Sequence, residues 1–315
     1  MKVLVVGGAG YIGGAVTDLL LQSGIDFTVY DNLLYERQYL KPVDFMTGDV
    51  RDTKKLGEIL PNYTHVIWLA AIVGDGACTI DPPTTVAVNQ TAVEWLARNY
   101  FGRIIFLSTC SVYGQNDAWL SESSDLNPLS LYAQTKLAAE QSLANKNALI
   151  FRLGTAHGLS DIHSRIRLDL AINYMTMNAL TQGSLTIFGG DQWRPFVHVK
   201  DIARSIVKSL GVADTGIYNL ATSNLQIKEV GQTIAQRTGC AINEAERQFS
   251  DPRNYRVTTD KANQAGLLPA HTEFTVAFGV DEIARLVKSG RIKDLDHPAY
   301  SNERYVLQVT NTHNG

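Results

Sequence analysis

Tyr132 and Lys136, two side chains that could take part in catalysis, lie four residues apart in the middle of the chain. They fall within 131–143, a stretch of good helix formers with apolar residues at helical spacing, so both would share one helical face. An unperturbed tyrosine, with a pKa of about 10, is a poor base at neutral pH. A neighbouring ammonium favours the phenolate and is expected to lower that pKa, which would let the phenol accept a proton from an alcohol.

A hydroxyl group precedes this pair along the chain. The apolar run 104–107 reads as a buried strand and is followed at once by Ser108 and Thr109. The Thr109 hydroxyl could hydrogen-bond the same substrate oxygen as Tyr132 and so fix the geometry of attack. Because a tyrosine four residues before a lysine is common by chance, this interpretation depends on the elements around it.

The N-terminal elements supply that context. A β-branched run at 3–6, typical of a strand buried on both faces, leads into a glycine turn at 7–13 and a helical segment at 15–21. A second strand at 27–30 ends in Asp31. Such a turn lets the backbone approach a pyrophosphate, the helix start favours its negative charge, and the acid accepts hydrogen bonds from ribose hydroxyls. The unit therefore predicts a dinucleotide site.

The residues after Asp31 indicate which dinucleotide. Asn32, Leu33 and Leu34 follow, and no arginine precedes Arg37. A 2′-phosphate would meet the Asp31 carboxylate and be repelled, so NAD is favoured over NADP.

Gly7, Gly10 and Gly13 are three residues apart, and with Thr109 and the Tyr-x-x-x-Lys pair they form a specific combination. It resembles the extended short-chain dehydrogenase/reductase family, the NAD-dependent epimerase/dehydratase group. The resemblance implies an α/β fold: a Rossmann doubly wound parallel sheet with a smaller C-terminal α/β substrate-binding part. It makes Thr109, Tyr132 as base and Lys136 its catalytic residues. It implies NAD contacts from Gly7, Gly10, Tyr11, Ile12, Gly13, Asp31, Asn32, Asp49, Val50, Leu69, Ala70, Ala71 and Asn89.

The resemblance also implies where substrate binds. In nucleotide-sugar members an asparagine meets the substrate's phosphate, and Asn173 matches it. Arg194 would contact the nucleotide part and Arg253 the diphosphate, with Arg256 as the alternative to Arg253 and a solvated loop arginine as another. Asn89 could equally be only the N-cap of a helix at 89–98.

The implied division of the chain places NAD binding in 1–155, with 196–235 returning to that part. Substrate would bind to 156–195 and 236–297, and a polar, irregular tail would occupy 298–315.

The resemblance narrows the reaction to NAD-dependent hydride transfer at C4 of a hexose or heptose in a nucleotide-sugar, by an epimerase or dehydrogenase. Cys110 and Ser111 follow Thr109 where dehydratases carry an acid pair, which disfavours 4,6-dehydration. Cys110 lies one residue before the acid/base cysteine of epimerase-reductases, so it could serve as an acid/base or be a small buried thiol. A 4-keto reductase and a non-catalytic NAD-binding regulator stay open. Parts of the chain resemble GDP-heptose 4-dehydrogenases, and Thr155 replaces an asparagine of the UDP-galactose epimerases.

Composition excludes other classes of protein. The 315 residues carry 28 Lys+Arg against 31 Asp+Glu, a net charge of −3, with no basic stripe for nucleic acid or a membrane surface. Three separated cysteines predict neither a disulfide framework nor a structural metal site. No apolar run reaches bilayer length and no signal peptide is evident, so a cytoplasmic protein is expected. Family resemblance predicts a homodimer that packs the 89–98 and 131–143 helices.

Overall fold

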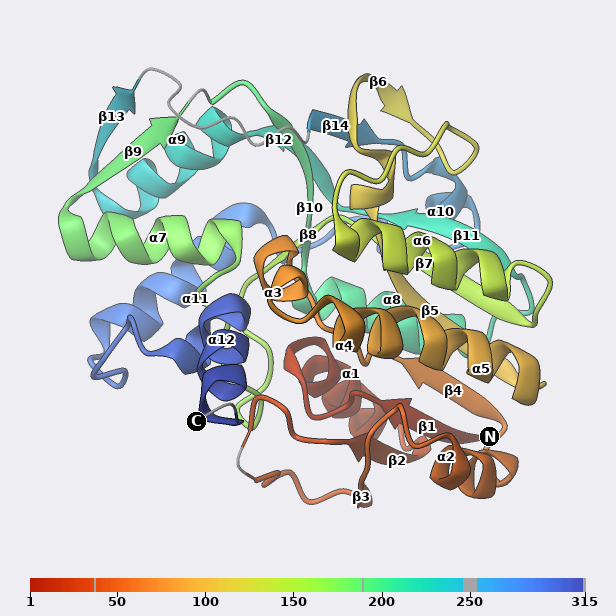
Figure 1. Ribbon diagram of the computed structural model, residues 1–315. Helices are drawn as coiled ribbons and strands as arrows, with labels where there is room; N and C mark the ends of the chain where they lie inside the picture. The colour runs from red at the N-terminus through yellow and green to blue at the C-terminus, as the bar shows by residue number, and fades with distance from the viewer. Residues whose placement is uncertain (37, 189, 246–253, 314–315) are drawn as a thin grey trace.

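The computed structural model describes residues 1–36, 38–188, 190–245 and 254–313. At its centre lies a seven-stranded sheet in the order β11-β7-β5-β4-β1-β2-β3, with every neighbouring pair parallel (Figure 1). The strands are β1 (Lys2–Val6), β2 (Asp26–Asp31), β3 (Phe45–Thr47), β4 (His65–Trp68), β5 (Arg103–Thr109), β7 (Ala148–Leu153) and β11 (Gly216–Leu220). The doubly wound parallel α/β fold expected from the sequence is confirmed.

Helices cover both faces of this sheet because its strands alternate apolar residues to both sides. Val3 and Val5 face α1 (Tyr11–Gln22) and α8 (Val199–Ser209), whereas Leu4 and Val6 face the opposite layer. That opposite layer includes α2 (Thr53–Ile59), α5 (Ala92–Asn99) and α6 (Leu131–Leu143). Each of these four side chains is fully buried, worth roughly 1.5–3 kcal/mol apiece.

The order of the strands creates a crevice. The chain runs from β1 outward through β2 and β3, then returns to place β4 and β5 on the other side of β1. Ligands of open α/β sheets bind at the carboxyl ends of the strands where this reversal occurs. The topology therefore directs the glycine turn after β1 and the Thr109 end of β5 toward one edge.

A smaller group of helices and short sheets, here called the second layer, lies beside that edge. Here α7 (Ala171–Gln182), α9 (Ile227–Thr238) and α11 (Val276–Lys288) share an apolar cluster, and α9 packs with them rather than on the large sheet. Within the predicted return segment 196–235, β11 joins the seven-stranded sheet, α8 packs on it, and Val197 of β10 lies in the same apolar cluster. The small sheets contain β8 (Thr155–His157), β10 (Trp193–His198) and β12 (Ser223–Gln226); β9 (Ser184–Phe188) and β13 (Ala241–Ala245); and β6 (Gln115–Leu120) and β14 (Asn254–Val257).

The C-terminal tail differs from the prediction. Its described part is not irregular but ends in helix α12 (Asn302–His313), which lies beside α3 (Asp75–Ile80) (Figure 1). Val306 is buried in a cluster with Ile72 and Cys78. The mostly polar composition of this segment hid the one apolar face that tertiary packing uses.

The remaining helical elements connect these parts. They are α4 (Pro82–Val86), the π-helical turn η2 (Ala87–Thr91), α10 (Asp260–Gln264) and the single turns η1 (Leu60–Asn62), η3 (Cys110–Tyr113) and η4 (Pro298–Tyr300). No helix in the described ranges is both long and apolar enough to cross a bilayer.

Candidate active site

A cavity of about 1190 Å³ runs along the carboxyl ends of the central strands and into the second layer. It brings together side chains from distant parts of the chain. Among the predicted site residues, those that line it are Gly7, Gly10, Tyr11, Ile12, Gly13, Asp31, Asn32, Asp49, Val50, Leu69, Ala70, Ala71, Thr109, Tyr132, Lys136 and Arg194.

Helix α6 presents the tyrosine and lysine to this cavity. It begins after Ser130, whose hydroxyl accepts a hydrogen bond from the Ala133 N–H at 3.2 Å and caps the helix. Tyr132 then falls in the first turn and Lys136 one turn later on the same face. Thr109 ends β5, and its hydroxyl acts on the Tyr132 phenol. The three predicted catalytic residues therefore line the same cavity.

The electrostatics of Tyr132 differ from the sequence-based expectation. Burial raises the pKa of Tyr132, nearby Cys78 and Asp75 raise it further, and the charge of Arg167 and the Thr109 hydroxyl only partly oppose them. We expected the lysine to lower this pKa. Burial sets the direction instead, because low polarity penalises the charged phenolate, and Lys136 is not among the groups that act on this pKa in the described chain.

Lys136 is also strongly affected by burial. It is 3% exposed, and its Nζ lies 4.0 Å from the centroid of the Phe106 ring. Burial lowers the pKa of Lys136 to about 7, while Glu140, one turn further along α6, acts in the opposite direction. Glu140 is in turn held by Arg152 at 2.7 Å. The lysine can therefore change charge near neutral pH.

The glycine turn after β1 leaves no room for a side chain at Gly7 or Gly13. Gly7 has φ +82, and a Cβ there would lie 2.5 Å from the Ala70 backbone nitrogen. A Cβ at Gly13 would lie 2.5 Å from the Gly8 carbonyl oxygen. The turn thus passes close to β4 and brings the start of α1 to the cavity, a backbone suited to binding a dinucleotide phosphate.

The acid after β2 is held rigidly at the cavity wall. Asp31 accepts hydrogen bonds from the Ala9 N–H at 3.0 Å and the Leu33 N–H at 2.8 Å. Burial raises the pKa of Asp31, which these bonds partly offset. The free lone pairs of its carboxylate suit ribose hydroxyls, so the residues present fit NAD.

The adenine-side residues are linked to one another. Asn32 donates to the Asp49 carboxylate at 3.1 Å, and Arg51 bonds both oxygens of that carboxylate. The Arg51 bonds hold the pKa of Asp49 down at about 2. The Asp49 side chain is therefore ionised and held in one position in the cavity lining, and Val50 beside it is buried.

Comparison with known proteins agrees with this geometry. The model of the NAD dependent epimerase/dehydratase family matches residues 3–221. The chain belongs to the NAD-dependent epimerase/dehydratase family. A UDP-glucose 4-epimerase of Corynebacterium glutamicum is 28% identical over 309 aligned positions, covering 87% of this chain and 92% of that protein. A dTDP-glucose 4,6-dehydratase of Streptomyces niveus is 26% identical, covering 73% and 76%.

Solved structures carry the same fold. MoeE5, determined in complex with UDP-glucuronic acid and NAD, is 26% identical, with a TM-score of 0.76 over 92% of this chain and 100% of that one. This epimerase/dehydratase is accordingly an NAD-dependent enzyme. Bound NAD would supply a hydride acceptor beside the Tyr132 phenol.

Asn89 has a different place from the one expected. It lies inside the π-helical turn η2 of a helical stretch that begins at Pro82, so it is not an N-cap. Its amide is fully buried, accepts the Ile72 N–H and donates to the Ile72 carbonyl, each at 2.8 Å. Asn89 does not line the cavity. It holds the segment after β4 that does, a role often given to π turns near functional sites.

Asn173 is likewise used by the backbone. Its amide exchanges two hydrogen bonds with Gly158 and donates a third to the Arg167 carbonyl at 2.7 Å. The side chain is fully buried and does not line the cavity, contrary to the predicted phosphate contact. The Gly158 carbonyl also accepts the Tyr11 hydroxyl at 2.8 Å, so Asn173 helps to support the glycine turn.

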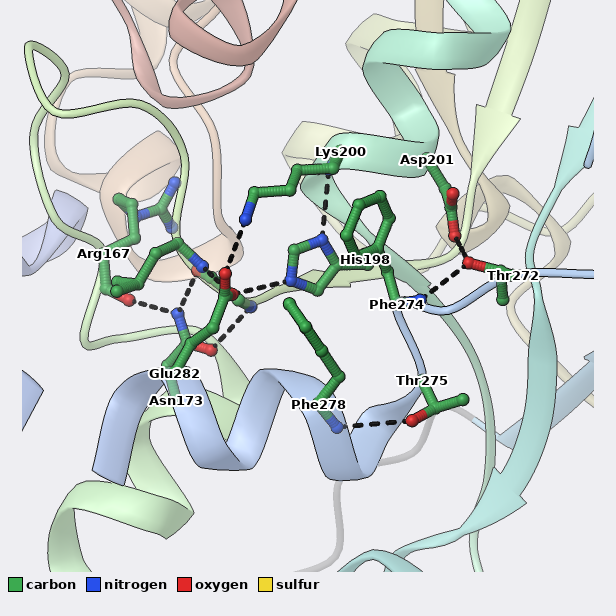
Figure 2. A network of polar contacts seen from close by, with 12 residues as sticks. Arg167, Asn173, His198, Lys200, Asp201, Thr272, Phe274, Thr275, Phe278 and Glu282 are labelled. Atoms are coloured by element: carbon green, nitrogen blue, oxygen red, sulfur yellow. Dashed lines mark hydrogen bonds and ion pairs between the residues drawn. The ribbon is translucent and has the colours of Figure 1, made fainter. Parts of the chain in front are cut away.

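A network of charged and polar side chains, formed by His198, Lys200 and Glu282, lies next to Asn173 (Figure 2). His198 Nδ1 accepts the Lys200 N–H, so its Nε2 donates to Glu282 at 2.8 Å. Lys200 Nζ donates to the other oxygen of Glu282 at 2.6 Å, and Leu159 donates its backbone N–H to the same carboxylate. These bonds bring the pKa of Glu282 to about 2, against the opposing effect of burial. His198 is therefore a fully buried residue with a partner at each ring nitrogen.

The arginines predicted to meet substrate are distributed differently. Arg194 lines the cavity, donates to the Trp193 carbonyl at 2.8 Å and lies over the Tyr255 ring. Arg253 lies outside the described residues. Arg256 points away, stacked between two tryptophan rings at 5.0 and 5.2 Å.

Two features of the cavity were not predicted. Arg165 lines it, and so do Ser301, Asn302 and Glu303 at the start of α12. Their only sequence signal was a pair of arginines before α7 and a weak apolar pattern in the tail. Cys110 is fully buried, donates toward the Arg152 carbonyl and does not line the cavity.

Proposed function

We propose that this enzyme oxidises C4 of a nucleotide-linked hexose or heptose and then either returns the hydride to the opposite face or releases the keto sugar. It would thus be a 4-epimerase or a 4-dehydrogenase. The observation that carries the proposal is that Thr109, Tyr132 and Lys136 all line the large cavity that begins at the glycine turn.

The chemistry assigns each side chain a task. Tyr132 takes the proton of the C4 hydroxyl while Thr109 hydrogen-bonds the same oxygen and orients it. The buried phenol needs a cation nearby to be ionised, and Lys136 provides one when it is protonated. Glu140 favours that protonated form and is therefore part of the support.

Dehydration receives less support from the same residues. A 4,6-dehydratase needs an acid and a base beside the active-site threonine. The next residue, Cys110, is buried away from the cavity, and burial raises the pKa of its thiol. Ser111 does line the cavity but carries no titratable group near neutral pH. We therefore place the reaction at C4 without elimination.

The proposed substrate class rests on relatives and on one arginine. A UDP-glucose 4-epimerase and MoeE5 with UDP-glucuronic acid are among the similar proteins. Arg194, whose fork suits a diphosphate, lines the cavity wall in the second layer. The homodimer expected through α5 and α6 stays a prediction, which light scattering of the purified protein would test.

The test uses purified protein and a panel of nucleotide sugars. Incubation with UDP-, GDP-, CDP- and dTDP-hexoses and heptoses, followed by NMR of the sugar, should reveal a C4 epimer or a 4-keto sugar. Tyr132→Phe should abolish turnover, by about a thousandfold or more, and leave NAD bound. Tyr63→Phe is the matched control, since Tyr63 precedes β4 at the opposite edge of the sheet.

The outcomes separate the candidates. Interconverted sugars without accumulated NADH indicate an epimerase, and NADH with a keto sugar indicates a dehydrogenase. A 4-keto-6-deoxy product would overturn the argument from Cys110 and Ser111. Full activity of Tyr132→Phe would overturn the assignment of the base.

A further inference from the structure

A buried arginine in the cavity wall has no use in the reaction described above. Arg165 is 9% exposed, and its Nε has no hydrogen-bond partner among the described residues. Its two other nitrogens donate to neutral acceptors, the Asn302 side-chain oxygen at 2.7 Å and the Ala299 carbonyl at 3.0 Å. No carboxylate of the described chain forms an ion pair with it. The guanidinium is therefore buried without a carboxylate bonded directly to it, although Glu36 and Asp169 act on its charge from further away.

The groups around Arg165 only partly offset the burial of its charge. Its guanidinium lies 4.1 Å from the Tyr35 ring centroid. The Glu36 carboxylate interacts with the charge of Arg165 and with its backbone N–H, but it forms no ion pair with the guanidinium among the described residues. Burial, together with the charge of Arg167, lowers the pKa of Arg165 to about 10. Arg167 already has a partner, because its guanidinium bonds both oxygens of Asp169.

The position of Arg165 relates it to the dinucleotide rather than to the sugar. Ser164, the preceding residue, lies directly against Gly14 in the first turn of α1. That segment is clamped to α1, since Lys41 bonds both the Gly14 carbonyl, at 2.9 Å, and Asp161, at 2.6 Å. The start of α1 is where the phosphates of a dinucleotide bind.

The C-terminal helix completes this arrangement. Asn302 is 4% exposed and bonds three segments of the cavity wall at once. Besides accepting from Arg165, it donates to the Val73 carbonyl and, through its backbone, to Asp169, both at 2.8 Å. Tyr305 of the same helix packs against the Tyr35 ring at 5.4 Å. The helix thus holds the arginine and the residues that follow β2 together.

We propose that Arg165, positioned by Asn302, binds the diphosphate of NAD, and that α12 is therefore part of the cofactor site. The orphan Nε would donate to a phosphate oxygen, and the negative diphosphate would supply an anion bonded directly to the guanidinium. This inference rests on the NAD dependence of the family and not on the proposed reaction at C4.

The test measures binding, not turnover. Protein freed of nucleotide is titrated by calorimetry with NAD, ADP, adenosine and UDP. Arg165→Gln should weaken NAD and ADP about tenfold or more, the usual effect of a hydrogen bond to a charged group, and leave adenosine unchanged. The loss should shrink as salt is added, because the contact is ionic. Arg204→Gln, a partly exposed arginine paired with Glu273 at the surface, is the matched control.

A second variant guards against misfolding. Asn302→Ala keeps Arg165 but frees its guanidinium, and it should weaken ADP binding while sparing adenosine. Equal losses for ADP and adenosine, or a lower melting temperature with unchanged ADP affinity, would reduce Arg165 to a structural link and overturn the proposal. A loss confined to UDP would place the arginine at the substrate's diphosphate and would overturn it as well.

Discussion

Lys136 offers a sharp test of how far burial perturbs the site. At pH values below 7 the folded protein holds this lysine charged and buried, with its pKa lowered from 10.5 to about 7. At about 1.4 kcal/mol per pH unit, the folded state loses up to about 5 kcal/mol relative to an unperturbed lysine. The contact between the ammonium and the Phe106 ring offsets about 1 kcal/mol of this destabilisation.

Lys136→Met removes the charge and should stabilise the NAD-free protein while abolishing activity. We expect it to exceed the wild type in free energy of unfolding by about 2 to 4 kcal/mol at pH 6. Between pH 7 and 10.5 the unfolded chain binds one proton more than the folded one at this site, so wild-type stability rises with pH. The advantage of the variant should therefore shrink by about 2 to 3 kcal/mol at pH 9.

Urea unfolding of both proteins at pH 6 and pH 9 measures this difference directly. Lys288→Met, which replaces an exposed lysine on α11, serves as the control and should show no such pH dependence. A variant less stable than wild type at pH 6, or an equal difference at both pH values, would show that Lys136 is not held in a costly charged state.

Three further changes test other parts of the site. Gly7→Ala should lose NAD on purification, because its Cβ would lie 2.5 Å from the Ala70 nitrogen at φ +82; absorbance of the purified protein at 260 nm against 280 nm reports this. Glu140→Gln should cost about 3 to 5 kcal/mol in urea unfolding by leaving Arg152 unpaired, and adding Arg152→Met should recover part of the loss. Cys110→Ala should keep more than half of kcat with any active sugar, and a thousandfold loss would make the thiol an acid/base after all.

The spacing of residues close together in the chain was enough to predict the glycine turn and the helix that carries Tyr132 and Lys136. Gly7, Gly10 and Gly13 are set three apart by a turn and a helix start, and Tyr132 and Lys136 share a face because a helix repeats every 3.6 residues. The helix predicted at 131–143 is observed with those bounds, as Leu131–Leu143. Such patterns depend on neighbours in the chain, so they can be read without knowing the fold.

The two asparagines show where local patterns stopped being informative. Asn89 and Asn173 fit the family pattern, yet both amides bond backbone groups of segments 15 to 17 residues away in the chain. A motif identifies the residue type, but it does not tell whether the side chain bonds a ligand or the backbone of the protein itself. Only the packing of η2 and α7 against the neighbouring loops decided that the amides support the cavity from behind.

The sequence by itself determined the nucleotide-binding unit and the tyrosine, lysine and threonine, because short-range backbone geometry defines all of them. Tertiary structure alone decided the pKa values of the site residues and which residues of the C-terminal segment line the cavity. It raised the pKa of Tyr132 through burial and joined Arg165 to Asn302, which is 137 residues further along the chain. Desolvation and long-range contacts sum over atoms from many segments, so no spacing within one segment could contain them.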